Sequence, residues 1–276
     1  MAETTKIEST EASWNPMASN FYESALSIPL KKDKPATWLV HSTNDLLDEE
    51  SDLFHETVSF EYIDRVFAVM ALCPQHTFQI LTKQAERMAE YLSAHDVGLR
   101  WALLGVRETK KGSPDIQTAI EWDHNGLPNV RLGVSCVDQY QADKRIPHLL
   151  NCPAHVRFLS CEPLLSQIDV PRIADIDLVI VSGESGPDSR PCNIDWIRSI
   201  LKQCFETGID CFVKQLGANV VDRNTTMACT FPDSQCWPDG TETDCHRILL
   251  KDKKGRNLDE WPEDLKVRQI PHVVTD

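Results

Sequence analysis

The chain has 276 residues, of which 41% are hydrophobic and 25% charged, and its formal net charge at pH 7 is −14. This length suits a single α/β barrel, for which roughly 250 residues are typical, so we expect one domain instead of two. The chain has no run of about 18 apolar residues and begins without a secretory signal, which excludes a membrane span and predicts a cytoplasmic protein. The acidic charge repels nucleic acid, so a polynucleotide partner would need a local basic surface.

The predicted elements begin after a polar segment. Residues 1–13 show no periodicity, and we interpret them as mobile. From Thr37 onward, short apolar runs alternate with amphipathic stretches. The first helix is indicated by apolar residues at helical spacing, namely Phe60, Ile63, Phe67 and Met70. Pro74 closes this helix, because proline cannot continue a helical hydrogen-bond ladder.

The middle of the chain gives a less regular signal. A strand is predicted over 77–83, a helix over 86–95 and a further strand over 130–135. Between them, from Gly98 to Pro128, the periodicity weakens, and 110–114 is interpreted as a surface excursion. Regular alternation resumes only at the strand over 130–135.

The second half of the barrel contains the clearest helix boundaries. Asp138 is a suitable N-cap for one helix, and Pro147 is expected to restart that helix as a short second segment. Another helix begins after the N-cap Asn193 and stops at Gly208. A strand over 211–213 follows. We therefore assign residues 14–216 to the barrel and 217–276 to an irregular extension packed on it, anchored by Trp237 and Trp261.

Six short apolar runs are each followed, and never preceded, by polar residues. The runs with their polar residues are Val40 with His41, Ser42, Asn44 and Asp45; Ile80-Leu81 with Thr82-Lys83; Leu132-Gly133-Val134 with Ser135 and Asp138; Phe158-Leu159 with Ser160-Cys161-Glu162; Leu178 to Val181 with Ser182-Gly183-Glu184-Ser185; and Phe212-Val213 with Lys214-Gln215. Continuous apolar runs are typical of parallel strands covered by helices. They predict an α/β fold with a parallel barrel, complete or partly open, and one ligand site at the carboxyl ends of its strands.

The ten cysteines fit reduced thiols that pack as small apolar residues, and no disulfide scaffold is expected. One group in the C-terminal region has ligand types that zinc accepts: Cys229, Cys236, Cys245 and His246. Its spacing lacks a Cys-x-x-Cys pair, so our prediction contains no metal site. Two short basic runs, Lys31 to Lys34 and Lys251 to Arg256, are interpreted as solvated loops.

Glu162 is the strongest candidate for ligand binding. It follows a buried strand, where an unpaired carboxylate would be costly, and Lys83 and Lys214 end other strands as available counter-charges. A purely structural Glu-Lys pair explains the same pattern equally well. The turn at Gly183 and Glu184 offers a second candidate, because its amides could bind an anion and its carboxylate an amine or a ribose. A tight turn alone would also explain the glycine.

Other residues of the predicted rim carry less information. Ser135 and Asp45 complete the predicted ligand-binding set, since each follows an apolar run. Cys161 has no identifiable partner base, so core packing is favoured over a nucleophilic role. Of the histidines, His41 is preferred only because it ends the first strand. No catalytic residue is assigned.

A series of motifs in chain order resembles a known family. They are Ala12-Ser13-Trp14-Asn15-Pro16, Ser51 to Glu56, Pro74 to Gln79 with Leu81-Thr82-Lys83, Leu127-Pro128-Asn129-Val130, Val156 to Leu165, Val181 to Pro187, Val213-Lys214-Gln215 and Glu260 to Leu265. The chain is similar to phage and mobile-element proteins with an N-terminal three-cysteine motif, which are regarded as radical-SAM-like barrels. The resemblance covers most of the chain. It implies a barrel that binds S-adenosylmethionine beside an iron–sulfur cluster.

One departure changes the expected chemistry. In the family, Trp-Asn-Pro is followed by three cysteines that would ligate the cluster, whereas here Trp14-Asn15-Pro16 leads to Asn20-Phe21-Tyr22. No cysteine precedes Cys73, and Phe21 stands where the third cysteine is expected. Because an aromatic ring cannot supply a thiolate, no iron–sulfur cluster is expected. Near-duplicate segments at 44–49 and 51–56 also leave open which of them matches the family's loop.

Three hypotheses follow. The leading one is a degenerate, cluster-less homologue that binds S-adenosylmethionine or a nucleotide-like small molecule at the rim. The second is an active radical enzyme that modifies nucleic acid or a base with unconventional cluster ligands. The third is a non-catalytic interaction protein of a mobile element, for which the acidic surface and the C-terminal extension would be the contact regions. These hypotheses leave open whether a nucleic acid or another protein is a partner.

Overall fold

The computed structural model describes residues 11–14, 23–40, 52–108, 116–170, 172–222 and 246–270. The chain divides into two compact units, of which unit 1 comprises 1–133 with 148–156 and unit 2 comprises 134–147 with 157–276. The boundary runs through β4 (Val130–Ser135), α7 (Gln139–Leu150) and β5 (Val156–Cys161). The expected division into 1–13, 14–216 and 217–276 stays a prediction.

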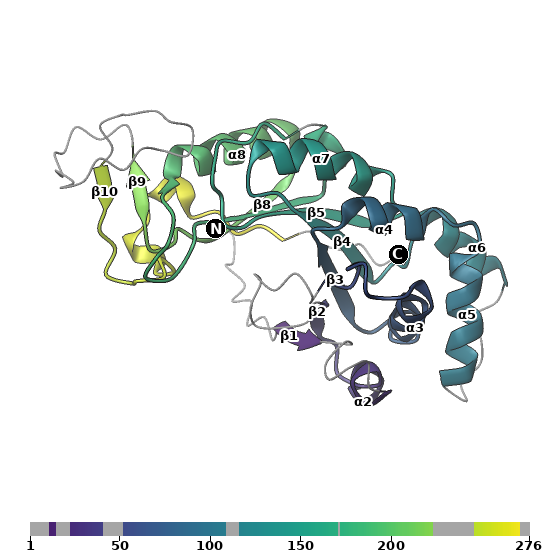
Figure 1. Cartoon of the computed structure of the whole chain (residues 1–276). Helices are drawn as coiled ribbons and strands as arrows, with labels where there is room; N and C mark the ends of the chain where they lie inside the picture. The colour runs from purple at the N-terminus through teal and green to yellow at the C-terminus, as the bar shows by residue number, and fades with distance from the viewer. Residues whose placement is uncertain are drawn as a thin grey trace, which may run out of the picture. The chain divides into compact units, whose positions relative to one another are not determined.

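Unit 1 is built from parallel strands and helices. Its strands, in sheet order, are β1 (Glu11–Trp14), β2 (Thr37–Val40), β3 (Thr77–Thr82) and β4. The β1–β2 and β2–β3 pairs are parallel. Its helices are α2 (Glu23–Leu26), α3 (Phe60–Ala71), α4 (Ala85–Leu92), α5 (Val97–Glu108) and α6 (Ile116–Asn125), with a 3-10 turn at Pro29–Lys31. Helix α3 packs against α5, and α5 against α6 (Figure 1).

The two helices α5 and α6 occupy the stretch where the sequence pattern weakens. Leu99, Leu103 and Ile120 are exposed apolar residues on them, which blurs the helical periodicity. Gly98 has a clear packing role, because a Cβ there would lie 2.1 Å from the carbonyl oxygen of Ala119. The close approach of α5 to α6 therefore depends on a residue without a side chain.

Unit 2 continues the parallel arrangement. In sheet order it contains the end of β4, then β5, β6 (Leu178–Ser182) and β8 (Asp210–Gln215), and the β5–β6 and β6–β8 pairs are parallel. A small sheet has the order β10 (His246–Ile248), β9 (Val220–Asp222), β7 (Cys192–Asn193). Helix α8 (Ile194–Thr207) joins β7 to β8, and Figure 1 shows α8 and β8. Three 3-10 turns lie at Ile173–Asp175, Leu258–Glu260 and Glu263–Leu265.

Helix α8 has the boundaries that the sequence predicts. The Asn193 side chain accepts a hydrogen bond from the Asp195 amide at 3.0 Å, and Gly208 ends the helix with φ +73°. Asp138 likewise accepts from the Gln141 amide at 2.8 Å, at the start of α7. The expected break at Pro147 is wrong, because α7 continues through that proline.

The outer edge of β8 is covered by the C-terminal segment. The Val213 amide donates to the Val267 carbonyl and the Gln269 amide to the Cys211 carbonyl, both at 2.9 Å, and Phe212 forms an antiparallel bridge with Arg268. Since β8 is the last strand in the sheet order, these bonds occupy the edge that a closing strand would need. This arrangement favours the partly open alternative over a complete barrel.

The coarse fold prediction is confirmed. All six apolar runs lie in strands, namely β2, β3, β4, β5, β6 and β8. Trp261, one of the two predicted anchors, is buried and donates from Nε1 to the Gly255 carbonyl at 3.0 Å. Trp237 lies outside the described residues. In the part of the chain that the structure describes, no helix is long and apolar enough to cross a membrane.

Candidate functional site

Glu162, directly after β5, is the centre of a polar cluster in unit 2. Its Oε1 accepts a hydrogen bond from the Ser160 hydroxyl at 3.2 Å, and its Oε2 accepts from the Ser182 hydroxyl at 3.1 Å. The Lys214 ammonium lies 2.9 Å from the same Oε2. The Glu162 side chain is 12% exposed and that of Lys214 47%, so the pair is formed at the surface end of the sheet. The structure thus brings together two of the predicted residues, Glu162 and Lys214.

The register of the strands explains this cluster. Ser160, Ile180 and Phe212 are neighbours across β5, β6 and β8. Since alternate residues share a face, Glu162 and Ser182 follow on the face of Ser160 and Ile180. The pairing of β6 with β8 shifts between Val181 and Ser182, next to the point where Lys214 enters the cluster.

The cluster keeps capacity for further hydrogen bonds. A carboxylate offers about four lone-pair positions, and Glu162 Oε1 accepts one bond among the described residues. The Lys214 ammonium has three donors, and its one ion pair in the described part of the chain is with Glu162. The half-buried Ile180 and Phe212 supply apolar surface on the neighbouring positions of the same strands. This combination suits a ligand with charged and apolar parts.

Gly183 is required for close packing of two backbones. A Cβ at Gly183 would lie 2.1 Å from the Leu216 carbonyl oxygen. The Gly183 amide donates to the Gln215 carbonyl at 3.1 Å, and the Gln215 side chain returns a bond to the Gly183 carbonyl at 3.2 Å. The Gly183 amide is therefore already engaged within the protein, which supports the tight-turn interpretation of this glycine.

Glu184 is paired within its own loop. Its carboxylate accepts three bonds of 2.8 Å from Arg190, from the backbone amide, Nε and Nη2. These bonds lower the pKa of Glu184 below its usual value, with side-chain hydrogen bonding as the largest cause. A ligand amine or ribose would have to compete with the Arg190 guanidinium for this carboxylate.

The predicted ligand-binding set left out four contributors to this region: Ser160, Ser182 and Gln215, which stand in the polar groups after the apolar runs, and Arg256. The two serines could have been found from their position, since each stands at a strand end in a polar cluster. No pattern in the sequence around Arg256 indicates that it contacts this region. Its Nε donates to Gln215 Oε1 at 3.1 Å from the C-terminal segment, at a separation of 41 residues. Its basic run was interpreted as a solvated loop, and for Arg256 that interpretation is too simple.

The other predicted residues occupy different positions. Ser135, at the end of β4 in unit 2, is buried, and its carbonyl accepts from Arg145 Nη1 at 2.6 Å. Lys83 belongs to unit 1, where its amide donates to Asp52 Oδ2 at 2.7 Å. Asp45 and His41 lie outside the described residues.

Asp52 is a rim residue that the sequence analysis did not single out. This buried carboxylate accepts from the Thr82 hydroxyl at 2.7 and 2.8 Å and from the Phe54 amide at 2.9 Å. It therefore fixes the 52–55 turn to the end of β3. Asp52 belongs to the second of the two near-duplicate segments, and the first, 44–49, lies outside the described residues. The near-duplication of 44–49 and 51–56 was the sequence feature that could have drawn attention to Asp52.

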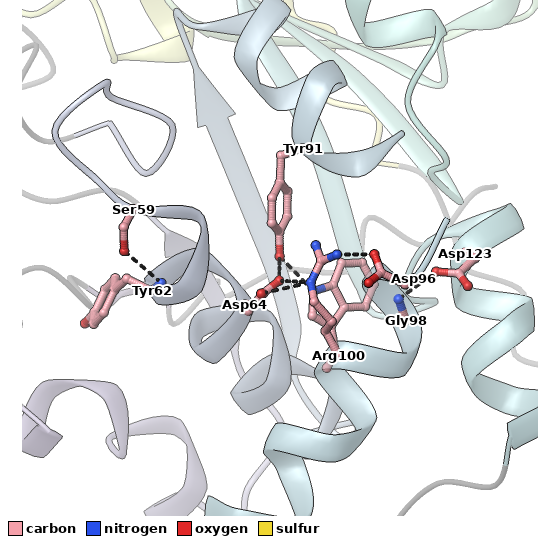
Figure 2. Close-up of polar contacts among 9 residues, drawn as sticks. Ser59, Tyr62, Asp64, Tyr91, Asp96, Gly98, Arg100 and Asp123 are labelled. Atoms are coloured by element: carbon pink, nitrogen blue, oxygen red, sulfur yellow. Dashed lines mark hydrogen bonds and ion pairs between the residues drawn. The ribbon is translucent and has the colours of Figure 1, made fainter. Parts of the chain in front are cut away.

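A second polar network lies in unit 1 around Asp64 (Figure 2). Asp64 accepts from the Tyr91 hydroxyl at 2.7 Å and from Arg100 Nε at 2.9 Å, and Trp101 Nε1 donates to the Tyr91 oxygen at 2.8 Å. Burial is the largest cause that raises the pKa of Tyr91 well above its usual value, followed by the Asp64 charge. A phenol held neutral in this way is a poor general base, so the network is better suited to a structural role.

The described thiols also give no nucleophile beside Glu162. Cys161 is fully buried, and burial raises its pKa well above the usual thiol value. This supports core packing over a nucleophilic role. Within the described ranges, no group of three or more His, Cys, Asp or Glu residues could hold a metal ion. Three of the candidate zinc ligands, Cys229, Cys236 and Cys245, lie outside those ranges.

Comparison with known proteins identifies the family of this chain but no individual relative. The family DUF5131, described as a protein of unknown function, matches residues 17–264. No curated protein and no solved structure matches the chain. The matched region contains every residue of the Glu162 cluster. The chain therefore belongs to the DUF5131 family of proteins of unknown function.

Proposed function

We propose that this protein binds S-adenosylmethionine or a related nucleotide-like small molecule at the Glu162 cluster of unit 2. The observation that carries this proposal is the pairing of a mostly buried carboxylate with a half-exposed ammonium at the end of a parallel strand. Ligands of open α/β sheets bind at this end of the strands. The resemblance to radical-SAM-like proteins suggests the class of ligand, and the Glu162 cluster suggests where that ligand would bind.

The chemistry of the cluster fits such a ligand. Glu162 can accept bonds from a ligand ammonium or hydroxyl group, while Lys214 can donate to a carboxylate or phosphate. Ser160 and Ser182 hold the Glu162 carboxylate in place, so its orientation is set before a ligand arrives. The neighbouring half-buried Ile180 provides apolar surface, while the Phe212 ring already has the Arg268 guanidinium over it, 5.2 Å from the ring centroid. We assign no reaction to this site.

The proposal does not include an iron–sulfur cluster. An iron–sulfur cluster needs thiolate ligands, and no cysteine precedes Cys73 in the sequence. Cys136 and Cys161, the two cysteines of the strand ends near Glu162, are both buried, and burial is the largest cause that raises their pKa values. These donors do not fit an exposed cluster site. The protein purified without oxygen should therefore contain no stoichiometric iron.

The direct test is calorimetry with S-adenosylmethionine, S-adenosylhomocysteine and adenosine. Glu162→Gln should weaken binding by roughly ten- to a hundredfold, because it removes one charge-assisted interaction. Glu263→Gln is the matched control, since Glu263 pairs with Lys266 at an exposed position of the same unit. Equal affinities of the wild type and Glu162→Gln would remove this residue from the site. No binding of any of the three compounds would contradict the proposal.

A further inference from the structure

Arg268 is an exposed cation on the C-terminal segment that covers the outer edge of β8. Phe212 and Arg268 form an antiparallel bridge, so their side chains lie on the same face of the sheet. The carbon of the Arg268 guanidinium lies 5.2 Å from the centre of the Phe212 ring and 5.6 Å from that of Trp261. Its Nη2 donates to the Lys214 carbonyl at 3.1 Å. These contacts hold the guanidinium beside Lys214, on the face of the sheet that carries the Glu162 cluster.

The Arg268 guanidinium has more donors than partners within the described residues. A guanidinium carries five N–H groups, and its hydrogen bond to the Lys214 carbonyl uses one of them. Burial lowers the pKa of Arg268, and no neighbouring carboxylate offsets that effect. By contrast, Arg190 and Arg198 of the same unit pair with carboxylates at 2.8 and 2.7 Å, and hydrogen bonds to those carboxylates raise their pKa values. A partly desolvated cation without a carboxylate partner is the arrangement that a bound anion would complete.

Lys214 connects Arg268 to the Glu162 cluster. Its carbonyl accepts the bond from Arg268, and its ammonium lies 2.9 Å from Glu162 Oε2. The three charged groups are two cations and one carboxylate, an excess of one positive charge in a chain whose net charge is −14. S-adenosylmethionine carries an ammonium, a sulfonium and a carboxylate, so its own net charge is positive. A nucleoside monophosphate instead carries about two negative charges at neutral pH. Charge complementarity therefore favours the phosphate-bearing compound.

The shape of the guanidinium also suits a phosphate. Its N–H groups form a planar fork that matches two phosphate oxygens, whereas an ammonium acts as a point charge. The Phe212 and Trp261 rings and the Lys214 carbonyl fix the position of this fork before a ligand arrives. A group that is already held in place loses less entropy when it binds. Arg268 is therefore better prepared for an anion than a side chain that extends freely into solvent.

We propose that Arg268 binds the phosphate of a nucleotide whose nucleoside part lies at the Glu162 cluster, so that the ligand class of this site is a nucleoside phosphate. The inference rests on the proposed function, because it takes the Glu162 cluster as the place of the nucleoside. Glu162 accepts bonds from hydroxyl or amino groups of the nucleoside, and Arg268 donates two parallel N–H bonds to the phosphate oxygens. The remaining donors of the Lys214 ammonium are available to the same ligand.

The test is calorimetry of the full chain with adenosine monophosphate and with adenosine, which differ only in the phosphate. The wild type should bind the monophosphate at least about tenfold more tightly, because charged hydrogen bonds form only with the phosphate. Added salt should reduce this advantage, since it screens the charges. If the monophosphate binds no more tightly than adenosine, the inference is wrong. The proposed function stands in that case as long as adenosine or S-adenosylmethionine binds and Glu162→Gln weakens that binding.

Variants of Arg268 assign the phosphate to this side chain. Arg268→Gln should weaken binding of the monophosphate by about ten- to a hundredfold and leave the affinity for adenosine unchanged. Arg268→Lys keeps the charge without the planar fork, so it should restore only part of that loss. Arg247→Gln is the matched control, because the exposed Arg247 of unit 2 also donates from Nη2 to a backbone carbonyl, that of Ala218 at 3.2 Å. The control should leave both affinities unchanged.

Two outcomes would overturn the assignment to Arg268. One is an equal affinity of the wild type and Arg268→Gln for the monophosphate. The other is an equal loss for Arg268→Gln and Arg247→Gln, which would show a general effect of positive charge. The comparison of the two compounds on the wild type needs no variant to fold, so a failure of Arg268→Gln to fold leaves that test in force.

Discussion

The two carboxylate networks of this protein use similar groups for different ends. Asp64 in unit 1 and Glu162 in unit 2 each accept bonds from hydroxyl groups and from one cation. The partner of Asp64, Tyr91, lies among aromatic rings and contacts Phe54, Phe60 and Phe67. Glu162 instead ends a strand, and the Lys214 cation that pairs with it is about half exposed.

The contrast between Asp64 and Glu162 shows how a structural network can be separated from a candidate site. Around Asp64 the Trp101 indole, the Tyr91 phenol and the Arg100 guanidinium all have partners within the protein. Such a network is satisfied and can specify how the helices pack. Around Glu162, one carboxylate oxygen and the Lys214 ammonium can still accept or donate. The position of unused hydrogen-bonding groups at a surface is thus more informative than the number of polar residues.

The largest effect is expected when the buried network loses its carboxylate. Asp64→Ala should lower the free energy of unfolding by about 3–5 kcal/mol, because it leaves the buried Tyr91 hydroxyl without its acceptor and removes the more buried of the two carboxylates that pair with Arg100. Asp96→Ala is the control, since Asp96 pairs with the same Arg100 but is 61% exposed. The control should cost less than about 1 kcal/mol. Urea unfolding of both variants measures the difference, and equal losses would contradict the structural assignment of Asp64.

The packing of α5 provides the next largest effect. Gly98→Ala should destabilise the protein by about 1–3 kcal/mol, because the added Cβ would meet the backbone of Ala119 in α6. Gly105 is the control in the same helix, because there a Cβ would lie 3.4 Å from the flexible Leu72 side chain. Gly105→Ala should be close to neutral or stabilising, since alanine favours helix. Thermal unfolding of both variants measures the difference. Equal melting temperatures would show that the α5–α6 contact tolerates a Cβ at position 98.

The sequence predicted the parts of the fold that depend on local patterns. Continuous apolar runs gave the strands, and the caps Asn193 and Gly208 gave the bounds of α8, because these signals act within a few residues. The helices α5 and α6 were missed because exposed Leu99, Leu103 and Ile120 obscure their buried side. Pro147 misled the prediction, since α7 tolerates a proline that usually interrupts a helix.

The candidate site was predictable in part. Glu162 and Lys214 were chosen from their positions after strands, and parallel pairing brings such residues to one end of the sheet. The partner of Glu184 was not predictable, because Arg190 meets it only through the shape of the intervening loop. Arg256 reaches Gln215 from the C-terminal segment, and nothing in either local pattern encodes that contact. Long-range polar pairs are therefore what the sequence could not supply.

Alkaline pH should expose a smaller contribution from Tyr91. Its pKa is raised in the folded state, so its contribution to stability is complete below the unfolded value near 10 and is lost as the pH rises above it. Tyr91→Phe should cost about 1–3 kcal/mol at neutral pH, because it leaves the Trp101 Nε1–H without its acceptor and removes the hydroxyl donor of Asp64. It should also flatten the loss of stability above about pH 10. Urea unfolding from about pH 8 to about pH 11 measures this slope, with the exposed Tyr140→Phe as the control.

The smallest effect is expected at the surface loop of Glu184. The pKa of Glu184 is lowered in the folded state, so its ion pair contributes above the unfolded value near 4.5 and is lost as the pH falls below it. Because the Arg190 side chain is 49% exposed, solvent screening limits Glu184→Gln to less than about 1 kcal/mol at neutral pH. That difference should vanish in acid, whereas Glu206→Gln, at an exposed pair with Lys202, should change little at either pH. A loss above about 3 kcal/mol for Glu184→Gln would place this loop with the Asp64 network, as a structural element instead of a surface pair.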